Sequence, residues 1–426
     1  MNLGLFLYRS ALRIFSLALK GAAAFNPKAR LFVEGRKQIF EEIRAALPAN
    51  GNNPRVWFHC ASLGEFEQGR PVIEKFKEIF PEYEVVLTFY SPSGYEVRKH
   101  YKLASYVFYL PIDGPENSRK FLDLIKPDAS FFIKYEFWYY YLKELDTRKI
   151  PTFSVSAIFR SDQLFFKSYG GFYEEMLHFF THIFVQDRNS KSLLNEIGIE
   201  NVSVSGDTRF DRVVDLRSHS KKLPLVDEFK NNQPLLVIGS SWKEDMDVLL
   251  PFISKNKYSL KYIIAPHEIH EDNIKAIQLS VKLPSIRYSK ALEIKDRSLS
   301  KYSVLIIDNI GLLSSLYSYG EYAYIGGAFG KGLHNTLEAA TFGVPIIFGN
   351  KNYAKFKEAT ELISEGGAFA IANEKELDDA FQFLSAPGEL QKAGEISAAY
   401  ILKNVGATDQ IITYCKQLLD SKGIKH

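Results

Sequence analysis

Short apolar runs rich in β-branched and aromatic residues alternate with helical patterns along this chain from Arg55 onward. Such alternation is typical of βαβ units, in which helices join the strands of a parallel sheet. Between Asp211 and Pro234, charged and polar residues interrupt the pattern. Strands are expected at 55–60, 84–89, 106–110, 129–134, 152–155, 182–186 and 202–204, and then at 235–239, 261–265, 304–307, 322–325, 344–348 and 368–371. The alternation therefore predicts an α/β protein with two Rossmann-like domains facing a central cleft.

The length of 426 residues is comfortable for two domains. We expect a membrane-associated segment at 1–35, a first Rossmann-like domain at 36–211, a linker at 212–233, a second Rossmann-like domain at 234–405, and a C-terminal helix at 406–426 able to cross back onto the first domain. The net charge of +3 is too small to predict a nucleic-acid partner. The two cysteines, Cys60 and Cys415, have no metal-like spacing and favour a reducing compartment over a disulfide framework.

The N-terminal segment, residues 1–25, is strongly apolar but carries Arg9, Arg13 and Lys20. On a helical wheel these three cations fall within roughly 40° of one another. The uncharged runs between them are shorter than the ~20 residues of a spanning helix. The pattern favours an amphipathic helix that lies on the membrane surface over one packed on its own domain or on a partner, and over a true span.

A glycine-rich segment, GGAFGKGLHNTLEAATFGVPIIFG, runs from Gly326 and Gly327 to residue 349. Loops of this kind leave backbone N–H groups free, and the N-terminus of a following helix favours a phosphate. Glu338 lies early in that helix, where it can accept hydrogen bonds from ribose hydroxyls. Asn335 and Glu338 also have N-cap and N3 spacing, which is compatible with binding. The segment resembles the donor loop of two-Rossmann-domain (GT-B) nucleotide-sugar transferases.

Charged residues in the first half follow three expected strands. Glu65 follows the first, Glu136 follows the strand at 129–134, and Arg160 follows the strand at 152–155. Because the carboxyl ends of parallel strands share one edge, these groups are expected to converge there as a site. For Glu65 the alternative is a capping box with Ser62, although a proline at position 71 favours a helix start near residue 70 instead.

Polar residues also follow the first two strands of the second half. Ser240 and Ser241 either cap the next helix or meet a phosphate with the free N–H groups of the turn. His267, at a strand end, either contacts a phosphate or is simply solvated. No His, Cys and carboxylate cluster has metal-site spacing, so no metal is expected.

Together these motifs resemble the 3-deoxy-D-manno-octulosonic acid (Kdo) transferases of lipopolysaccharide synthesis. Their order along the chain matches that of the family. The matching segments are Ala61-Ser62-Leu63-Gly64-Glu65, Glu136-Phe137-Trp138, Gly206-Asp207-Thr208-Arg209-Phe210-Asp211, Asp308 through Leu313 with Tyr317, and Gly326-Gly327 through His334-Asn335-Thr336-Leu337-Glu338-Ala339-Ala340.

The resemblance implies transfer of Kdo from CMP-Kdo to the 6′-hydroxyl of a lipid A precursor, with inversion, at the cytoplasmic face of the inner membrane. Glu65 is then the general base and Glu136 orients the acceptor or the base. The first domain would bind the acceptor, and Arg160 or Arg209 would pair with the Kdo carboxylate. The CMP moiety would be held by Ser240, Ser241, His267, Asn335 and Glu338, near the loop at Gly326-Gly327. CMP-Kdo is a substrate, and no cofactor is implied.

The chain departs from the family pattern at four places. Lys134-Tyr135-Glu136 keeps one carboxylate of the usual pair, Tyr139-Tyr140 follow Trp138, Arg209 replaces a lysine, and Ser241-Trp242 replaces a Ser/Thr-His pair. Two other hypotheses remain open at this level. One is a different GT-B enzyme, such as a UDP-sugar transferase or a nucleotide-sugar 2-epimerase, and the other is a membrane-bound nucleotide- or lipid-binding protein.

Overall fold

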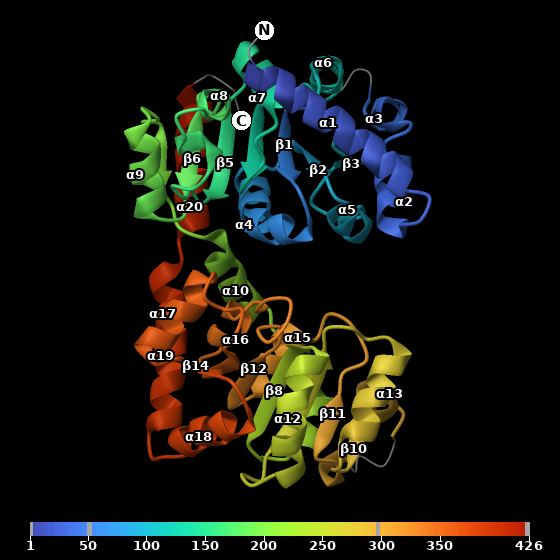
Figure 1. The fold of residues 1–426 in the computed structure, drawn as a ribbon, viewed down its shortest axis with the longest axis vertical. Helices are drawn as coiled ribbons and strands as arrows, with labels where there is room; N and C mark the ends of the chain where they lie inside the picture. The colour runs from blue at the N-terminus through green and yellow to red at the C-terminus, as the bar shows by residue number, and fades with distance from the viewer. Residues whose placement is uncertain (1–2, 49–52, 295–298, 422–426) are drawn as a thin grey trace. The chain divides into compact units, whose positions relative to one another are not determined.

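The computed structural model describes residues 3–48, 53–294 and 299–421. The chain forms two compact units, unit 1 with residues 1–212 and 405–426, and unit 2 with residues 213–404. Each unit is built on a seven-stranded sheet in which every neighbouring pair of strands is parallel. Helices cover both faces of the sheets (Figure 1). The predicted α/β fold with two Rossmann-like units is confirmed.

The sheet of unit 1 has the strand order β3-β2-β1-β4-β5-β6-β7. Its strands are β1 (Arg55–Cys60), β2 (Glu84–Phe89), β3 (Tyr106–Tyr109), β4 (Ala129–Ile133), β5 (Thr152–Ala157), β6 (His182–Val185) and β7 (Val202–Val204). After β3 the chain returns to the other side of β1, so the strand order reverses between β1 and β4. The loops after these two strands diverge at such a switch point and leave a crevice where α/β proteins bind ligands.

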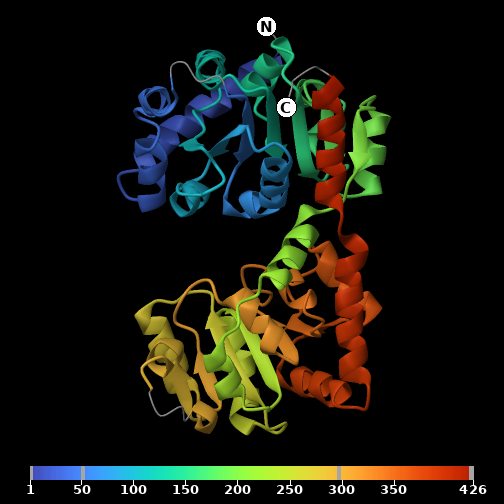
Figure 2. The same cartoon turned by 180° about the vertical axis from the view of Figure 1, so that it is seen from behind.

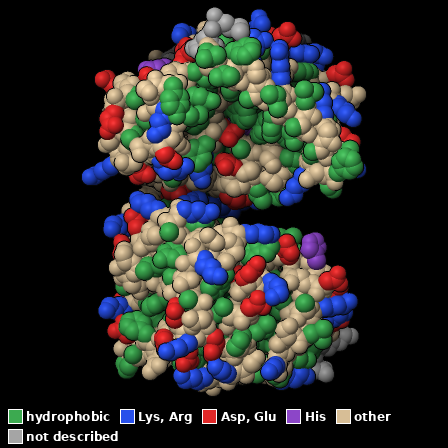
Figure 3. All heavy atoms as spheres, viewed as in Figure 1, with side chains coloured by type: hydrophobic (Ala, Val, Ile, Leu, Met, Phe, Trp, Pro, Cys, Tyr) green, Lys and Arg blue, Asp and Glu red, His purple; other side chains and the backbone are tan. Residues whose placement is uncertain are grey.

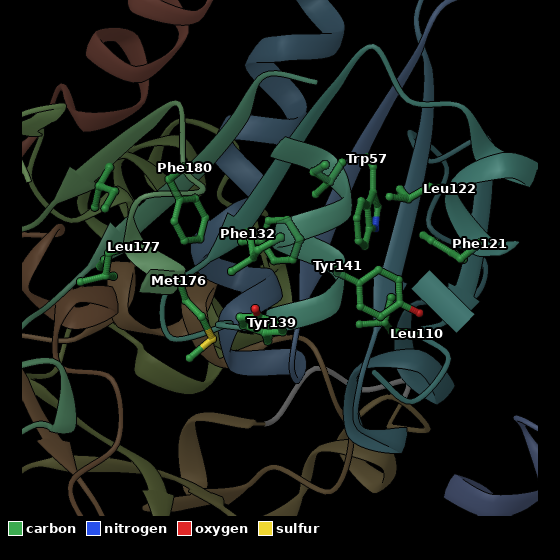
Figure 4. Packing of buried hydrophobic residues seen from close by; sticks show 14 of the residues in the cluster. Trp57, Leu110, Phe121, Leu122, Phe132, Tyr139, Tyr141, Met176, Leu177 and Phe180 are labelled. Carbon is green, nitrogen blue, oxygen red and sulfur yellow. The ribbon is translucent and has the colours of Figure 1, made fainter. Parts of the chain in front are cut away.

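The helices of unit 1 bury one face each against this sheet. They are α3 (Ile39–Ala46), α4 (Leu63–Ile79), α5 (Pro92–Arg98), α6 (Pro115–Ile125), α7 (Tyr139–Thr147), α8 (Gly171–Leu177), α9 (Arg188–Glu196) and α20 (Ala407–Ser421), with the short η1 (Leu164–Phe166). On one face, Trp57 of β1 packs edge-on against Phe121 and Phe132, each with ring centroids 5.0 Å away (Figure 4). On the other face, α20 buries Ile411 and Cys415 beside α4, and Figure 2 shows α20 in red along the sheet.

Two further helices precede the sheet of unit 1, α1 (Leu3–Ala22) and α2 (Pro27–Glu34). Asn26 caps α2 by accepting from the backbone of Lys28, and Pro27 begins it. α1 buries none of its residues fully, but the Tyr8 hydroxyl donates to Asp113 Oδ2 at 2.6 Å. No helix in the described ranges is both long enough and apolar enough to cross a membrane.

The sheet of unit 2 has the order β10-β11-β9-β8-β12-β13-β14, which reverses between β8 and β12. Its strands are β8 (Leu235–Ser241), β9 (Lys261–Pro266), β10 (Ser285–Arg287), β11 (Val304–Ile306), β12 (Tyr322–Ile325), β13 (Ile346–Gly349) and β14 (Ala368–Ile371). Its helices are α12 (Lys243–Lys255), α13 (Glu271–Ser280), α14 (Tyr288–Ala291), α15 (Leu313–Leu316), α16 (Leu337–Ala340), α17 (Lys357–Glu365), α18 (Glu374–Leu384) and α19 (Glu389–Asn404), with 3-10 turns η2 (Leu299–Lys301) and η3 (Tyr317–Tyr319).

The structure differs from the expected elements at β10 and in the linker. β10 was missed, because three residues are too few to show an alternating pattern. The segment expected as a linker, 212–233, contains most of α10 (Thr208–Ser218) and all of α11 (Pro224–Lys230). Pro224 begins α11, and Val226 and Phe229 are buried. Because of the charged residues on the solvent side of α11, the sequence pattern did not reveal this short helix with an apolar face.

Candidate active site

Glu65 lies in the first turn of α4, directly after β1. The helix begins at Leu63, with Pro71 inside it, so the alternative start near residue 70 is wrong. Ser62 is the N-cap residue, but its side chain caps no backbone N–H. Instead the Ser62 hydroxyl donates to the Glu65 carboxylate. The capping box is therefore not formed, and the carboxylate is held at the carboxyl end of β1 rather than committed to the helix backbone.

Glu136 lies in the loop between β4 and α7, on the other side of the switch point. Two side chains donate to its Oε2 atom, Trp138 Nε1 at 2.7 Å and His59 Nε2 at 3.0 Å. The thiol of Cys60 is fully buried, and after burial the largest effects that raise its pKa are the charges of Glu65 and Glu136. Both carboxylates therefore converge on the end of β1, as the strand order requires.

A chain of hydrogen bonds sets the orientation of His59, which is completely buried. Trp57 Nε1 donates to Thr88 Oγ1 at 2.8 Å, and Thr88 Oγ1 lies 2.8 Å from His59 Nδ1. A carboxylate oxygen can only accept, so His59 Nε2 carries the ring proton in its bond to Glu136. The Trp138 indole nitrogen also lies 3.2 Å from His59 Nε2, but its shorter bond is the one to Glu136. Sequence reasoning assigned His59 no role, since only the pairing of β1 with β2 and β4 brings these residues together.

The two arginines of the first half have different surroundings. Arg160 lies after β5, its side chain is 60% exposed, and it has only a long 3.8 Å contact with Asp162 among the ion pairs of the described residues. Arg209, at the start of α10, pairs with buried Asp207 through Nε at 2.8 Å. Burial acts to raise the pKa of the Asp207 carboxyl, but Arg209 outweighs it and holds that pKa below its usual value. Arg209 is therefore engaged by a structural partner, whereas Arg160 faces solvent.

In unit 2 the loop after β12 packs directly on the end of β8. A Cβ atom added to Gly326 would lie 2.3 Å from the carbonyl oxygen of Ser240, so no larger residue fits. Gly327 adopts φ = +96° and its N–H donates to Asp245 Oδ2 at 2.8 Å. Asp245, in the first turn of α12, also accepts from the backbone of Trp242 at 2.8 Å. One carboxylate thus joins both loops of the second switch point.

Three stacked rings lie at this switch point. His267 stacks on Trp242 and on His334, with ring centroids 4.4 and 4.6 Å apart. The Trp242 indole donates to His334 Nε2 at 3.0 Å, so that nitrogen must be unprotonated. Burial, and then the charge of His267, lower the pKa of His334 to about 4. His334 is therefore neutral at pH 7, with its proton on Nδ1.

The remaining predicted donor residues surround this stack. Asn335 Oδ1 accepts from the backbone of Leu337 at 3.1 Å, and Asn335 Nδ2 donates to Glu338 Oε1 at 3.1 Å. The N-cap of α16 is Thr336, one residue later than the spacing predicted, so Asn335 precedes the cap and bonds to the first residue of the helix. The Ser241 hydroxyl is buried and has no hydrogen-bond partner within the described part of the chain. A buried polar atom of this kind needs a partner, and it lies beside the loop that favours a phosphate.

The fold, with one switch point in each unit, identifies the structural class of the protein. The fold matches solved GT-B structures, including UDP-GlcNAc 2-epimerase from Neisseria meningitidis bound to UDP-GlcNAc, with a TM-score of 0.59, 16% identity and coverage of 85% of this chain and 100% of that one. A 2-epimerase from Listeria monocytogenes gives a TM-score of 0.58 at 12% identity, covering 87% of this chain and 97% of the other. These likenesses establish the GT-B fold alone.

Comparisons by sequence link the chain to Kdo transferases. Residues 35–212 match the family model described as 3-Deoxy-D-manno-octulosonic-acid transferase (kdotransferase). The chain is 27% identical to the 3-deoxy-D-manno-octulosonic acid transferase of Rickettsia bellii over 89% of its own length and 92% of the relative's. It is 28% identical to that of Aquifex aeolicus over 82% of its length and 92% of the relative's. The chain is thus similar to Kdo transferases over most of its length, and this similarity supports a glycosyltransferase.

Proposed function

We propose that this protein transfers Kdo from CMP-Kdo to the 6′-hydroxyl of a lipid A precursor (lipid IVA), with inversion at the anomeric carbon. The observation that carries this is the convergence of Glu65 and Glu136 around the end of β1, in the unit matched by the family model. Unit 1 would bind the acceptor and unit 2 the donor.

Glu65 is the proposed general base. Its carboxylate takes the proton of the acceptor hydroxyl as the oxygen attacks the anomeric carbon of Kdo and the bond to the CMP phosphate breaks. The Ser62 hydroxyl, which donates to Glu65, orients this carboxylate in the absence of substrate. A positioned general base contributes roughly 10²–10⁴-fold to the rate. Glu136, held by His59 and Trp138, orients the acceptor.

The donor side is proposed at the second switch point. Ser240, Ser241 and the loop at Gly326-Gly327 would meet the phosphate of CMP, since the Ser241 hydroxyl is buried and has no hydrogen-bond partner among the described residues. His267, Asn335 and Glu338 would hold the remainder of the nucleotide. Arg160 is the better candidate for the Kdo carboxylate, because its side chain is exposed while Arg209 is paired with Asp207. No metal is proposed, as the CMP leaving group carries a single phosphate.

The membrane association is proposed to depend on α1. Leu3, Leu7, Ile14 and Leu17 recur along one strip of this helix and are 57–70% exposed. Arg9, Arg13 and Lys20 lie along the edge of that strip, and hydrophobic and basic side chains gather where α1 runs (Figure 3). This is the arrangement of a helix that lies in the interface of an anionic membrane. We place the enzyme at the cytoplasmic face of the inner membrane, with lipid acceptor and CMP-Kdo as its partners.

The test is transfer of Kdo from CMP-Kdo, generated in situ, to a tetraacyl lipid A precursor in detergent, followed by mass spectrometry. A mass increment of one or more Kdo units is expected with the wild type. Glu65→Gln keeps the size and hydrogen-bonding capacity of the side chain but removes the base, and should lower turnover about 10²–10⁴-fold while CMP affinity is retained. A wild-type protein that is folded and binds CMP but yields no increment would exclude this donor and acceptor pair.

A further inference from the structure

A groove runs beneath α1 in unit 1. It consists of two adjoining cavities of about 300 and 470 Å³ that share Ser16 and Ile112. We call it the α1 groove. The first cavity is also lined by Arg9 and Arg13, and the second by apolar residues of α1 and α2 together with Lys20, Arg36 and Lys37. Neither lining contains Glu65 or Glu136, so the groove is separate from the candidate catalytic carboxylates.

One end of the α1 groove carries unpaired positive charge. Arg9 and Arg13 are four residues apart on one helix and therefore neighbours on its surface. Neither forms an ion pair with a carboxylate among the described residues. The one carboxylate in the lining, Asp113, already accepts from the Tyr8 hydroxyl and from the backbone of Tyr140 and Tyr141. Two adjacent guanidinium groups without a partner suit the oxygens of a phosphate.

The other end of the groove is more apolar but also carries two lysines. Leu19 of α1, Phe32 and Val33 of α2, and Ile112 line the larger cavity together with Lys20 and Lys37. Arg36 also borders it, but its guanidinium donates to the carbonyl oxygens of Phe32, Leu110 and Tyr90. That guanidinium is thus part of the wall rather than a free ligand. A cavity of this size can take part of a hydrocarbon chain, because burial of CH₂ groups away from water is favourable.

We propose that the α1 groove binds one anionic phospholipid of the membrane, with its phosphate between Arg9 and Arg13 and one acyl chain beyond Ser16. A ligand that carries both a phosphate and an acyl chain would occupy both ends of the groove at once. The exposed apolar strip of α1 would keep the groove at the depth of the lipid headgroups. The bound lipid would fasten α1 to the rest of unit 1, supplementing the bond between Tyr8 and Asp113.

The experiment measures binding of monomeric dihexanoyl phosphatidylglycerol to the full-length protein by isothermal titration calorimetry, with no vesicles present. Dihexanoyl phosphatidylcholine and inorganic phosphate serve as separate probes. We expect Arg9→Gln with Arg13→Gln to weaken binding of the anionic lipid at least tenfold. The matched control, Lys28→Gln with Arg30→Gln, removes the same charge from neighbouring α2 outside the groove lining and should change affinity less than twofold.

A second pair of variants tests the groove without changing charge. Ser16→Phe fills the junction of the two cavities and should abolish lipid binding, whereas Ser10→Phe, which lies on α1 outside both linings, should not. Equal losses in the two charge variants, or normal binding by Ser16→Phe, would overturn the proposal. So would a tetraacyl lipid A precursor that displaces the phospholipid at a lower concentration than other phospholipids do, because the groove would then be an acceptor site. Since the readout is lipid binding, failure here leaves the transferase proposal separately testable.

Discussion

His59 Nε2 lies 3.0 Å from Glu136 Oε2, and this contact joins the end of β1 to the loop after β4. The two residues are 77 positions apart in the chain and meet only because β1 and β4 are neighbours in the sheet. The buried imidazole is oriented from behind by Thr88 and Trp57. His59 is therefore a positioning residue for a carboxylate that is proposed to act on the acceptor.

Replacing His59 is expected to lower turnover while donor affinity is maintained. His59→Phe removes the donor to Glu136, and a hydrogen bond to a charged group contributes about 1.5–3 kcal/mol, which corresponds to a 10–200-fold loss in kcat/KM. His59→Gln can still present an N–H near the Nε2 position and should recover part of the activity. The measurement is Kdo transfer together with CMP affinity by calorimetry. Equal activities in the two variants would contradict a positioning role.

The neutral state of His334 predicts a specific dependence of stability on pH. Its pKa in the folded protein is about 4, below the ordinary value of 6.5, so the unfolded chain binds the extra proton first as the pH falls. The free energy of unfolding therefore decreases through this residue as the pH falls from about 6.5 to about 4. His334→Asn should flatten this part of the pH profile relative to wild type. Thermal unfolding at pH 7, 6, 5 and 4.5 measures the difference, and parallel profiles would disprove it.

The contact between Gly326 and Ser240 predicts a large effect from a single added methyl group. Gly326→Ala places a Cβ atom 2.3 Å from the carbonyl oxygen of Ser240, where backbone must move. Overpacking of this kind costs about 1–3 kcal/mol, and CMP affinity should fall with it. Gly330→Ala, in the same loop, meets only the Glu244 carboxyl group at ordinary contact distance and is the matched control. Denaturant unfolding and CMP titration of both variants give the comparison.

Removal of divalent cations is expected to leave the transfer reaction unchanged. No group of three His, Cys, Asp or Glu side chains among the described residues could hold a metal ion. The proposed donor site instead offers backbone N–H groups, the Ser241 hydroxyl and uncharged histidines to a single phosphate. Kdo transfer should proceed at the same rate with EDTA as with added Mg²⁺. A rate that falls with EDTA and returns with Mg²⁺ would require a metal in the donor complex.

Much of the site was accessible to sequence reasoning because it depends on strand ends. Glu65, Glu136, Ser240 and Gly326 each follow an apolar run, and parallel strands place such positions on one edge. The capping alternative for Glu65 could not be decided in this way. Whether Ser62 bonds to the helix backbone or to the Glu65 carboxylate depends on side-chain conformation. The spacing of the two residues is the same in both cases and cannot decide between them.

Other features depend on tertiary contacts. Asp207 and Arg209 are only two positions apart, but the burial of Asp207 and its bond to Gln68, 139 positions away, depend on the fold. Trp242 departs from the family pattern, and its role emerges only when its indole is seen to donate to His334, 92 positions later. No local pattern predicts a hydrogen bond between side chains so far apart.

The sequence by itself determined the alternation of strands and helices, the parallel sheets, and the positions where reactive groups could lie, because hydrophobic periodicity and loop composition act over a few residues at a time. The tertiary structure alone decided which of those groups are positioned, paired or left without a partner. His59 bonds to Glu136, Arg209 to Asp207, and the Ser241 hydroxyl to nothing in the described chain. Those outcomes depend on strand order and burial, which bring residues together irrespective of their separation in sequence.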